Sequence, residues 1–152
     1  DNFINYRGSF SGQMVKQAPT GVSLENNQWQ FDFPADGVYY IQVLAEPTDG
    51  QPAKKGIFKA MIDSEPPSVP RIKISNQKPK KGEIVRIKAF SSDSLSGTQK
   101  SFYYSVNGGV LLPFGEELAI SFPATGVYKL SVRAFDNADN YSDSDLIIEV
   151  TD

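Results

Sequence analysis

Hydrophobic and polar residues alternate along two similar stretches of the chain, residues 29–45 and residues 118–134. Each stretch consists of an alternating segment, a Pro-Ala-x-Gly turn and a second alternating segment that opens with Val-Tyr. Alternation with a period of two, broken by a turn that contains Pro and Gly, is typical of half-buried antiparallel strands. The pattern therefore predicts an all-β protein.

The two stretches belong to one internal repeat. They align without gaps at a spacing of 89 residues, from Trp29 and Leu118 through to Asp63 and Asp152. A spacing close to that value matches one small β-sandwich domain. We therefore expect two tandem antiparallel β-sandwiches.

The predicted domains are residues 1–63 and 71–152, with a proline-rich linker at residues 64–70. The three prolines of this linker favour extended, semi-rigid geometry, so the two domains would form an elongated rod. In the repeat register the first domain is shortened and lacks counterparts of roughly the first two strands. Either residues 1–28 replace these strands by another route, or the upstream part of the domain is missing.

The last strand of the two copies differs in phase. Its inward positions are 58, 60 and 62 in the first copy and 146, 148 and 150 in the second. At a repeat spacing of 89 residues these positions are out of phase by one. A loop should therefore differ by one residue between the copies.

Composition narrows the function classes. The net charge of −3 argues against a nucleic-acid partner, because nucleic-acid-binding domains usually carry a basic surface. The chain contains no Cys and no His, which removes thiolate and imidazole metal ligands and the usual nucleophile–base pairs of enzymes. Carboxylate-only catalysis, as in glycosidases, stays open, but a non-catalytic protein is expected.

Hydropathy gives no sign of a membrane-spanning segment. No apolar run approaches the length that a transmembrane helix needs, so this segment is not expected to insert into a membrane. Neither an initiator Met nor a signal peptide is visible, which suggests a processed product or an excised fragment.

The segment Gly126-Val127-Tyr128-Lys129-Leu130 resembles the start of strand F in immunoglobulin-like domains. In that superfamily a Tyr at this place forms the tyrosine corner, and Tyr39 and Tyr128 stand at the matching positions. The Cys that antibody domains carry two residues later is replaced by Ile41 and Leu130, which excludes a disulfide-bonded variant.

The resemblance is closer to bacterial surface immunoglobulin-like and fibronectin type III-like modules. It rests on residues 103–109, Tyr-Tyr-Ser-Val-Asn-Gly-Gly, and on residues 126–140, although the family usually has Gly where this chain has Asp139. The dipeptide Asn107-Gly108 also predicts a hairpin turn, because both central positions of such turns favour positive φ. The resemblance implies an extracellular or cell-surface, non-catalytic repeat module and no particular ligand.

Acidic residues gather in a predicted loop at residues 136–144. In a sandwich of this topology that loop lies at the same pole as loop 91–99. Oxygen ligands at short spacing suit Ca²⁺, which takes six to eight of them, and no other cofactor is expected. The candidate ligands are Asp93, Asp136, Asp139, Asn140 and Asp143, with Asp145 beside them. The alternative is a solvated loop in which Asp136 and Asn140 bond backbone amides in tight turns.

Two tyrosines are candidate ligand-binding residues. Alternation points Trp29, Tyr39 and Tyr128 into the core but points Tyr40 and Tyr103 outward. An exposed Tyr can stack on a sugar ring or anchor a protein interface. The alternative is a single exposed aromatic residue on each strand.

Basic residues of the second domain are expected to form a solvated face that protects edge strands, rather than a binding patch. They are Arg71, Lys73, Lys78, Lys80, Lys81, Arg86 and Lys88.

These observations favour a structural or adhesive module that spaces or presents another domain outside a cell. A second hypothesis is a binding module for an unidentified protein or polysaccharide, using Tyr40, Tyr103 or the acidic pole. A third is self-association, in which unpaired strand edges of the first domain are completed by a neighbouring chain, as in a filament or surface layer. Among these hypotheses, an enzyme that uses only carboxylates is the least favoured.

Overall fold

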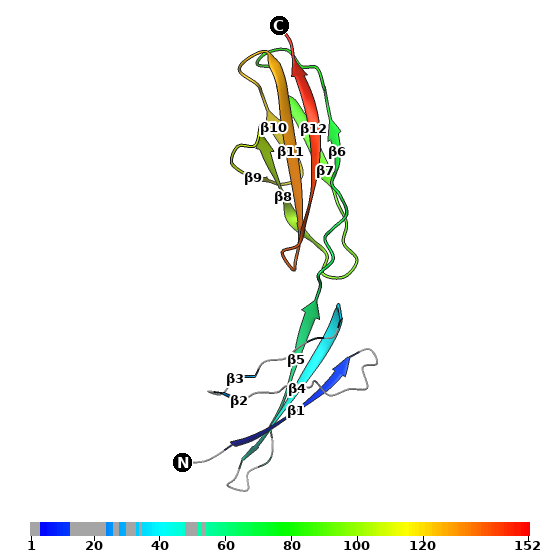
Figure 1. Ribbon diagram of the computed structural model, residues 1–152, viewed down its shortest axis with the longest axis vertical. Coiled ribbons are helices and arrows are strands. Elements are labelled where there is room, and N and C mark those ends of the chain that lie inside the picture. The colour runs from blue at the N-terminus through cyan, green and yellow to red at the C-terminus, as the bar shows by residue number, and fades with distance from the viewer. Residues whose placement is uncertain are drawn as a thin grey trace. The chain divides into compact units, whose positions relative to one another are not determined.

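Figure 1 shows the computed structural model, in which every described element is a β-strand. The chain divides into two compact units, residues 1–63 and residues 64–152. No helix of the described part is long and apolar enough to cross a membrane. The predicted all-β class is confirmed. The residues that the structure describes are 4–12, 24–25, 28–29, 33, 35–47, 52 and 54–152.

The second unit consists of two antiparallel sheets. The three-stranded sheet has the order β10-β7-β6 and the four-stranded sheet the order β12-β11-β8-β9. The first sheet comprises β6 (Arg71–Ile74), β7 (Val85–Phe90) and β10 (Leu118–Ile120). The second comprises β8 (Thr98–Val106), β9 (Leu112–Phe114), β11 (Gly126–Asp136) and β12 (Tyr141–Val150).

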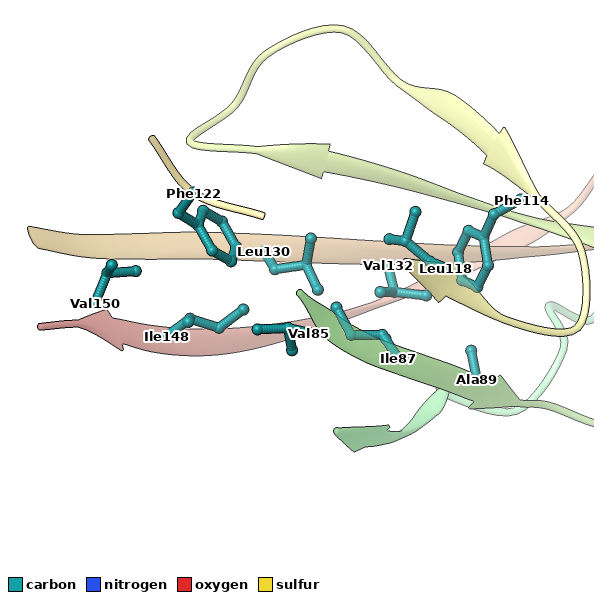
Figure 2. Packing of buried hydrophobic residues seen from close by; sticks show 10 residues of the cluster. All are labelled: Val85, Ile87, Ala89, Phe114, Leu118, Phe122, Leu130, Val132, Ile148 and Val150. Atoms are coloured by element: carbon teal, nitrogen blue, oxygen red, sulfur yellow. The ribbon is translucent and has the colours of Figure 1, made fainter. Parts of the chain in front are cut away.

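The core lies between these two sheets. Strict alternation on β7 buries Val85, Ile87 and Ala89 and exposes the residues between them. Leu130 and Ile148 of the facing sheet are fully buried in the same cluster. Figure 2 shows side chains of both sheets converging in one layer, as in aligned sandwich packing. The predicted inward face of the last strand is confirmed, since Leu146, Ile148 and Val150 all contact this core.

The proline-rich segment 64–70 is bound to the second unit. The Ser68 amide donates to the Ser92 carbonyl at 2.8 Å, and the Ser142 hydroxyl donates to the Pro67 carbonyl at 2.6 Å. Pro67 and Pro70 are buried. Because proline has no N–H that burial could leave unpaired, it suits a segment lying against a sheet end. The residues predicted as a linker thus belong by their contacts to the second unit.

The internal repeat is visible in the strands. The strand β4 (Gly37–Pro47) has 11 residues, as has β11, and the two ranges are 89 residues apart. The next strand, β5 (Lys54–Ile62), pairs with β4 so that Ile62 lies opposite Gly37, whereas Val150 lies opposite Gly126. At the repeat spacing Val150 corresponds to Met61. The registers therefore differ by one residue, which confirms the predicted phase difference.

The first unit contains a three-stranded antiparallel sheet of order β1-β4-β5. The strand β1 (Ile4–Gly12) lies beside β4 as β8 lies beside β11. A two-residue pair, β2 (Leu24–Glu25) and β3 (Gln28–Trp29), completes the described strands. Counterparts of β6 and β7 are not found among the described residues of this unit. A second complete sandwich stays a prediction.

One turn has the predicted backbone geometry, and a second turn also contains a residue with positive φ. Asn107 and Gly108 have φ of 51° and 73°, and the Gly109 amide donates to the Val106 carbonyl at 2.9 Å, as the Asn-Gly dipeptide predicts. Asp139 has φ of 68°. Asp tolerates this left-handed conformation better than most residues, so the turn keeps its geometry.

Candidate functional site

Two turns lie together at one pole of the second unit. Residues 91–97 connect β7 to β8, and residues 137–140 connect β11 to β12. The Asn137 amide donates to the Gly97 carbonyl at 2.9 Å, and its side-chain Nδ2 donates to the Ser96 carbonyl at 2.8 Å. The predicted proximity of the two loops is confirmed.

Asp136, at the end of β11, closes the second turn. Its Oδ1 accepts from the amides of Ala138 and Asn140 at 2.8 and 2.9 Å, and its Oδ2 accepts from Asn140 Nδ2 at 2.8 Å. The residue is completely buried. A buried carboxylate must be paired with a cation or hydrogen-bonded, and here the donors of the same turn provide the hydrogen bonds.

Asp93 closes the first turn in the same manner. Its Oδ1 accepts from the amides of Gly97 and Leu95 at 2.8 and 3.0 Å. These bonds, the one from Gly97 above all, lower the pKa of Asp93 because they favour the charged carboxylate.

The two carboxylates lie close to each other. One oxygen of Asp93 and one of Asp136 are within 4.8 Å. Ca²⁺ binds oxygen at roughly 2.3–2.6 Å, so both atoms could reach one ion. The same separation is also explained without an ion, because four backbone amides from the two turns offset the repulsion between the carboxylates. Asp93 Oδ1 and both carboxylate oxygens of Asp136 already accept hydrogen bonds within their turns.

The remaining predicted ligands point elsewhere. Asp139 is exposed and accepts from Gln99 Nε2 at 3.1 Å. Asp143 accepts two bonds from Arg133, both at 2.8 Å, and Asp145 pairs with Lys129 at 2.8 Å.

The placement of Asp143 in the acidic loop, with Asp145 beside it, was wrong. Both residues lie in β12, because the ladder between β11 and β12 continues as far as the pair Phe135–Tyr141. The structure brings Asp93, Asp136 and Asn140 together and separates the others from them. The calcium site stays a prediction from the sequence.

Tyr103 is part of an aromatic cluster on the outer face of the four-stranded sheet. Its ring meets the Phe135 ring edge-on, with centroids 5.3 Å apart, and the Phe135 and Tyr141 centroids are 5.7 Å apart. The Arg133 guanidinium lies 3.7 Å from the Tyr141 centroid, within cation–π range, and its ion pair with Asp143 fixes its position. Arg133 lies opposite Tyr103 in the ladder, so three strands contribute to one surface.

Of the residues in this cluster, only Tyr103 was predicted from the sequence as a candidate ligand-binding residue. The signal for Arg133 and Phe135 was their alternation with the inward residues Val132 and Ala134 on β11. Tyr141 is half exposed and is the first residue of β12. It lies in the segment 136–144 that was predicted as a loop.

Tyr40, the other candidate, belongs to β4 of the first unit. It is 44% exposed and lies opposite Lys59 of β5, so its outward orientation is as predicted. Whether Tyr40 or Tyr103 binds a ligand stays a prediction.

The comparison with solved structures gives the fold. No protein-family model and no curated protein matches the chain. Its structure is similar to the fibronectin(III)-like modules of CbhA from Clostridium thermocellum, with a TM-score of 0.50 and 20% sequence identity, over 91% of this chain and 82% of that one. At this identity the likeness concerns the fold alone, and it confirms the expected fibronectin type III-like architecture.

Proposed function

We propose that the chain is a non-catalytic structural module of a larger extracellular protein, in which it spaces or presents a neighbouring domain. The observation that carries this proposal is the repeated tyrosine corner. Tyr39 donates to the Ala35 carbonyl at 2.6 Å, and Tyr128 donates to the Ala124 carbonyl at 3.0 Å. The residues that recur in both units therefore serve the fold.

Packing around the two corners supports the same proposal. The Tyr39 ring lies 4.8 Å from the Phe33 ring at 47°, and the Tyr128 ring lies 4.6 Å from the Phe122 ring at 42°. In the described part of the chain, every buried side-chain N or O atom has a hydrogen-bond partner. An unsatisfied buried polar group often marks a catalytic or ion-binding site, so this complete hydrogen bonding favours a structural role.

Small-angle X-ray scattering of the whole chain tests the spacer role. The proposal expects an elongated particle with a narrow distribution of interdomain distances. The control is a chain with Gly-Ser-Gly-Ser inserted after Asp63, because a flexible linker should broaden that distribution. A compact particle, or a distribution that the insertion does not change, would contradict the proposal.

Self-association through the first unit is a second candidate function. Phe58 lies opposite Ile41, on the same face of β5 as Ala60, whose partner Tyr39 is buried, yet Phe58 is 59% exposed. Its counterpart by strand register is Leu146, which contacts the core of the second unit. An apolar residue left exposed on a core-side face favours coverage by a second copy of the chain.

Sedimentation velocity over a range of concentrations tests this candidate. Phe58→Asp should abolish any rise in mass with concentration, because it places a charge on the core-side face. Ile57→Asp is the matched control, since Ile57 is 61% exposed and points to the opposite face. A monomer mass that is independent of concentration rules the candidate out.

A further inference from the structure

The outer face of the sheet β10-β7-β6 carries four of the ten Lys and Arg residues of the second unit. Alternation on β6 and β7 turns these side chains away from the core. In the ladder Lys73 lies directly opposite Lys88, and Arg71 lies opposite Phe90. The outward residues are Arg71, Lys73, Arg86, Lys88 and Phe90.

The charge on this face is only partly compensated. Glu117 pairs with Arg86 and, at 3.7 Å, with Lys88, and the Arg86 bond lowers the pKa of Glu117. Within the residues that the structure describes, no carboxylate forms an ion pair with Arg71 or Lys73. Like charges directly opposite one another, as Lys73 and Lys88 are, destabilise a sheet. This face therefore carries uncompensated positive charge in a chain whose net charge is −3.

A hollow adjoins the uncompensated part of the face. It has a volume of about 560 Å³, and its lining includes cations, hydroxyls and apolar groups but no carboxylate. Such a volume falls within the range of roughly 300–1,000 Å³ of small-molecule sites. The residues that line it are Ser68, Val69, Arg71, Lys73, Phe90, Ser91 and Ser92.

Two of the residues that line the hollow are apolar and exposed. Phe90 is 49% exposed and Val69 is 66% exposed. Lys73 Nζ lies over the Phe90 ring, 5.3 Å from its centroid, so positive charge and exposed aromatic surface adjoin each other. The hollow thus combines an aromatic ring, hydroxyl groups and two cations.

We propose that this face binds an acidic polysaccharide that carries carboxylates along its chain. A uronic acid ring has an apolar face for Phe90, hydroxyls for the serines and a carboxylate for Arg71 or Lys73. Outward neighbours on one strand are about 6.5–7 Å apart, so the cations form rows along the strands. An extended polyanion matches this arrangement. The inference concerns binding and stands independently of the proposed spacer role.

Biolayer interferometry with the whole chain and immobilised polygalacturonate tests the inference. We expect binding that weakens as salt screens the charges. The double variant Arg71→Gln/Lys73→Gln should lose affinity by about tenfold or more. Phe90→Ala should also weaken binding, although it changes no charge. Fully methyl-esterified polygalacturonate, which has the same sugar backbone without free carboxylates, should not bind.

The matched control is Lys80→Gln/Lys81→Gln. It removes the same number of charges from exposed lysines of the 79–82 turn, outside the hollow, and should leave the affinity unchanged within about twofold. Circular dichroism checks that each variant is folded. Absence of binding to polygalacturonate, or an equal loss in both double variants, would overturn the inference. Equally tight binding of polyglutamate would overturn it in favour of an acidic peptide.

Discussion

At the scale of single residues, each copy of the repeat depends on a glycine whose backbone conformation few other residues adopt. Gly37 and Gly126 stand two residues before the corner tyrosines, with φ of +154° and +142°. Residues with a side chain rarely adopt these values, whereas glycine does so without steric cost. The Gly-Val-Tyr sequence therefore fixes both the turn and the start of the strand that follows.

Substitution Gly126→Ala should destabilise the second unit by about 1–3 kcal/mol, since the backbone must hold an unfavourable φ. No atom lies within 4 Å of the added Cβ, so a steric clash is not involved. Chemical denaturation measures the change. Gly115→Ala is the control, because its Cβ also meets open space and its φ is not positive. Equal stability of the two variants would contradict the prediction.

The role of Asp136 is also decided at the residue scale. Asp136→Ala removes the acceptor for three donors of its turn. It should lower the free energy of unfolding by about 1.5–3 kcal/mol, the contribution of a hydrogen bond to a charged group. We expect the loss in melting temperature to be the same in excess Ca²⁺ and in chelator. A melting temperature of the native chain that rises with Ca²⁺, and no longer rises in the variant, would instead establish the calcium site.

At the scale of elements, carboxylates that accept backbone or side-chain bonds hold the turns and edges of the second unit. Asp93 closes the turn before β8, and Glu83 accepts from the Lys80 amide at 2.9 Å in the turn before β7. These bonds lower the pKa of both residues. The arrangement couples the stability of these turns to pH.

The direction of this pH dependence follows from the linkage between protonation and folding. Asp93 has a lower pKa in the folded chain than its ordinary 3.8, so its contribution to stability is fully present above that pH and is lost as pH falls through the folded value. Asp93→Asn should therefore lower the melting temperature at neutral pH. The difference in melting temperature between this variant and the native chain should shrink as the pH falls towards about 2. Thermal scans across pH measure this. Ser94→Asn, at an exposed neighbouring position, should show no such trend, and a difference independent of pH would contradict the assignment.

At the scale of the whole molecule, the second unit contains everything its core requires. All ten buried core residues belong to residues 85–150, and both sheets are formed within residues 71–150. In the segment 64–70 the Ser68 amide donates to the Ser92 carbonyl, and the Pro67 carbonyl accepts from the Ser142 hydroxyl. The second unit should therefore fold without the first.

A chain of residues 64–152 should unfold cooperatively at the same temperature as the second unit within the whole chain. A chain of residues 71–152 should melt lower, because it loses the bonds to Ser92 and Ser142. Circular dichroism during heating compares the two. Equal melting temperatures would mean that residues 64–70 behave as a free linker, and failure of the longer chain to fold would contradict the autonomy of the unit.

The sequence by itself determined the features that depend on neighbours along the chain. Alternation with a period of two identified strands because successive side chains of a strand point to opposite faces. The phase of positions 58–62 and 146–150 predicted the register difference for the same reason, and Asn107-Gly108 predicted a turn because φ preference is a property of single residues. The corner tyrosines followed from a resemblance that these local signals carry.

Only the tertiary structure decided which distant residues meet. It extended β12 back to Tyr141, so that Asp143 pairs with Arg133 across the ladder and leaves the predicted acidic site. It joined Tyr103 to Phe135, and it placed Arg71 and Lys73 beside Phe90. These contacts depend on strand order and register, which arise from the packing of whole sheets, and alternation alone does not specify which strands become neighbours.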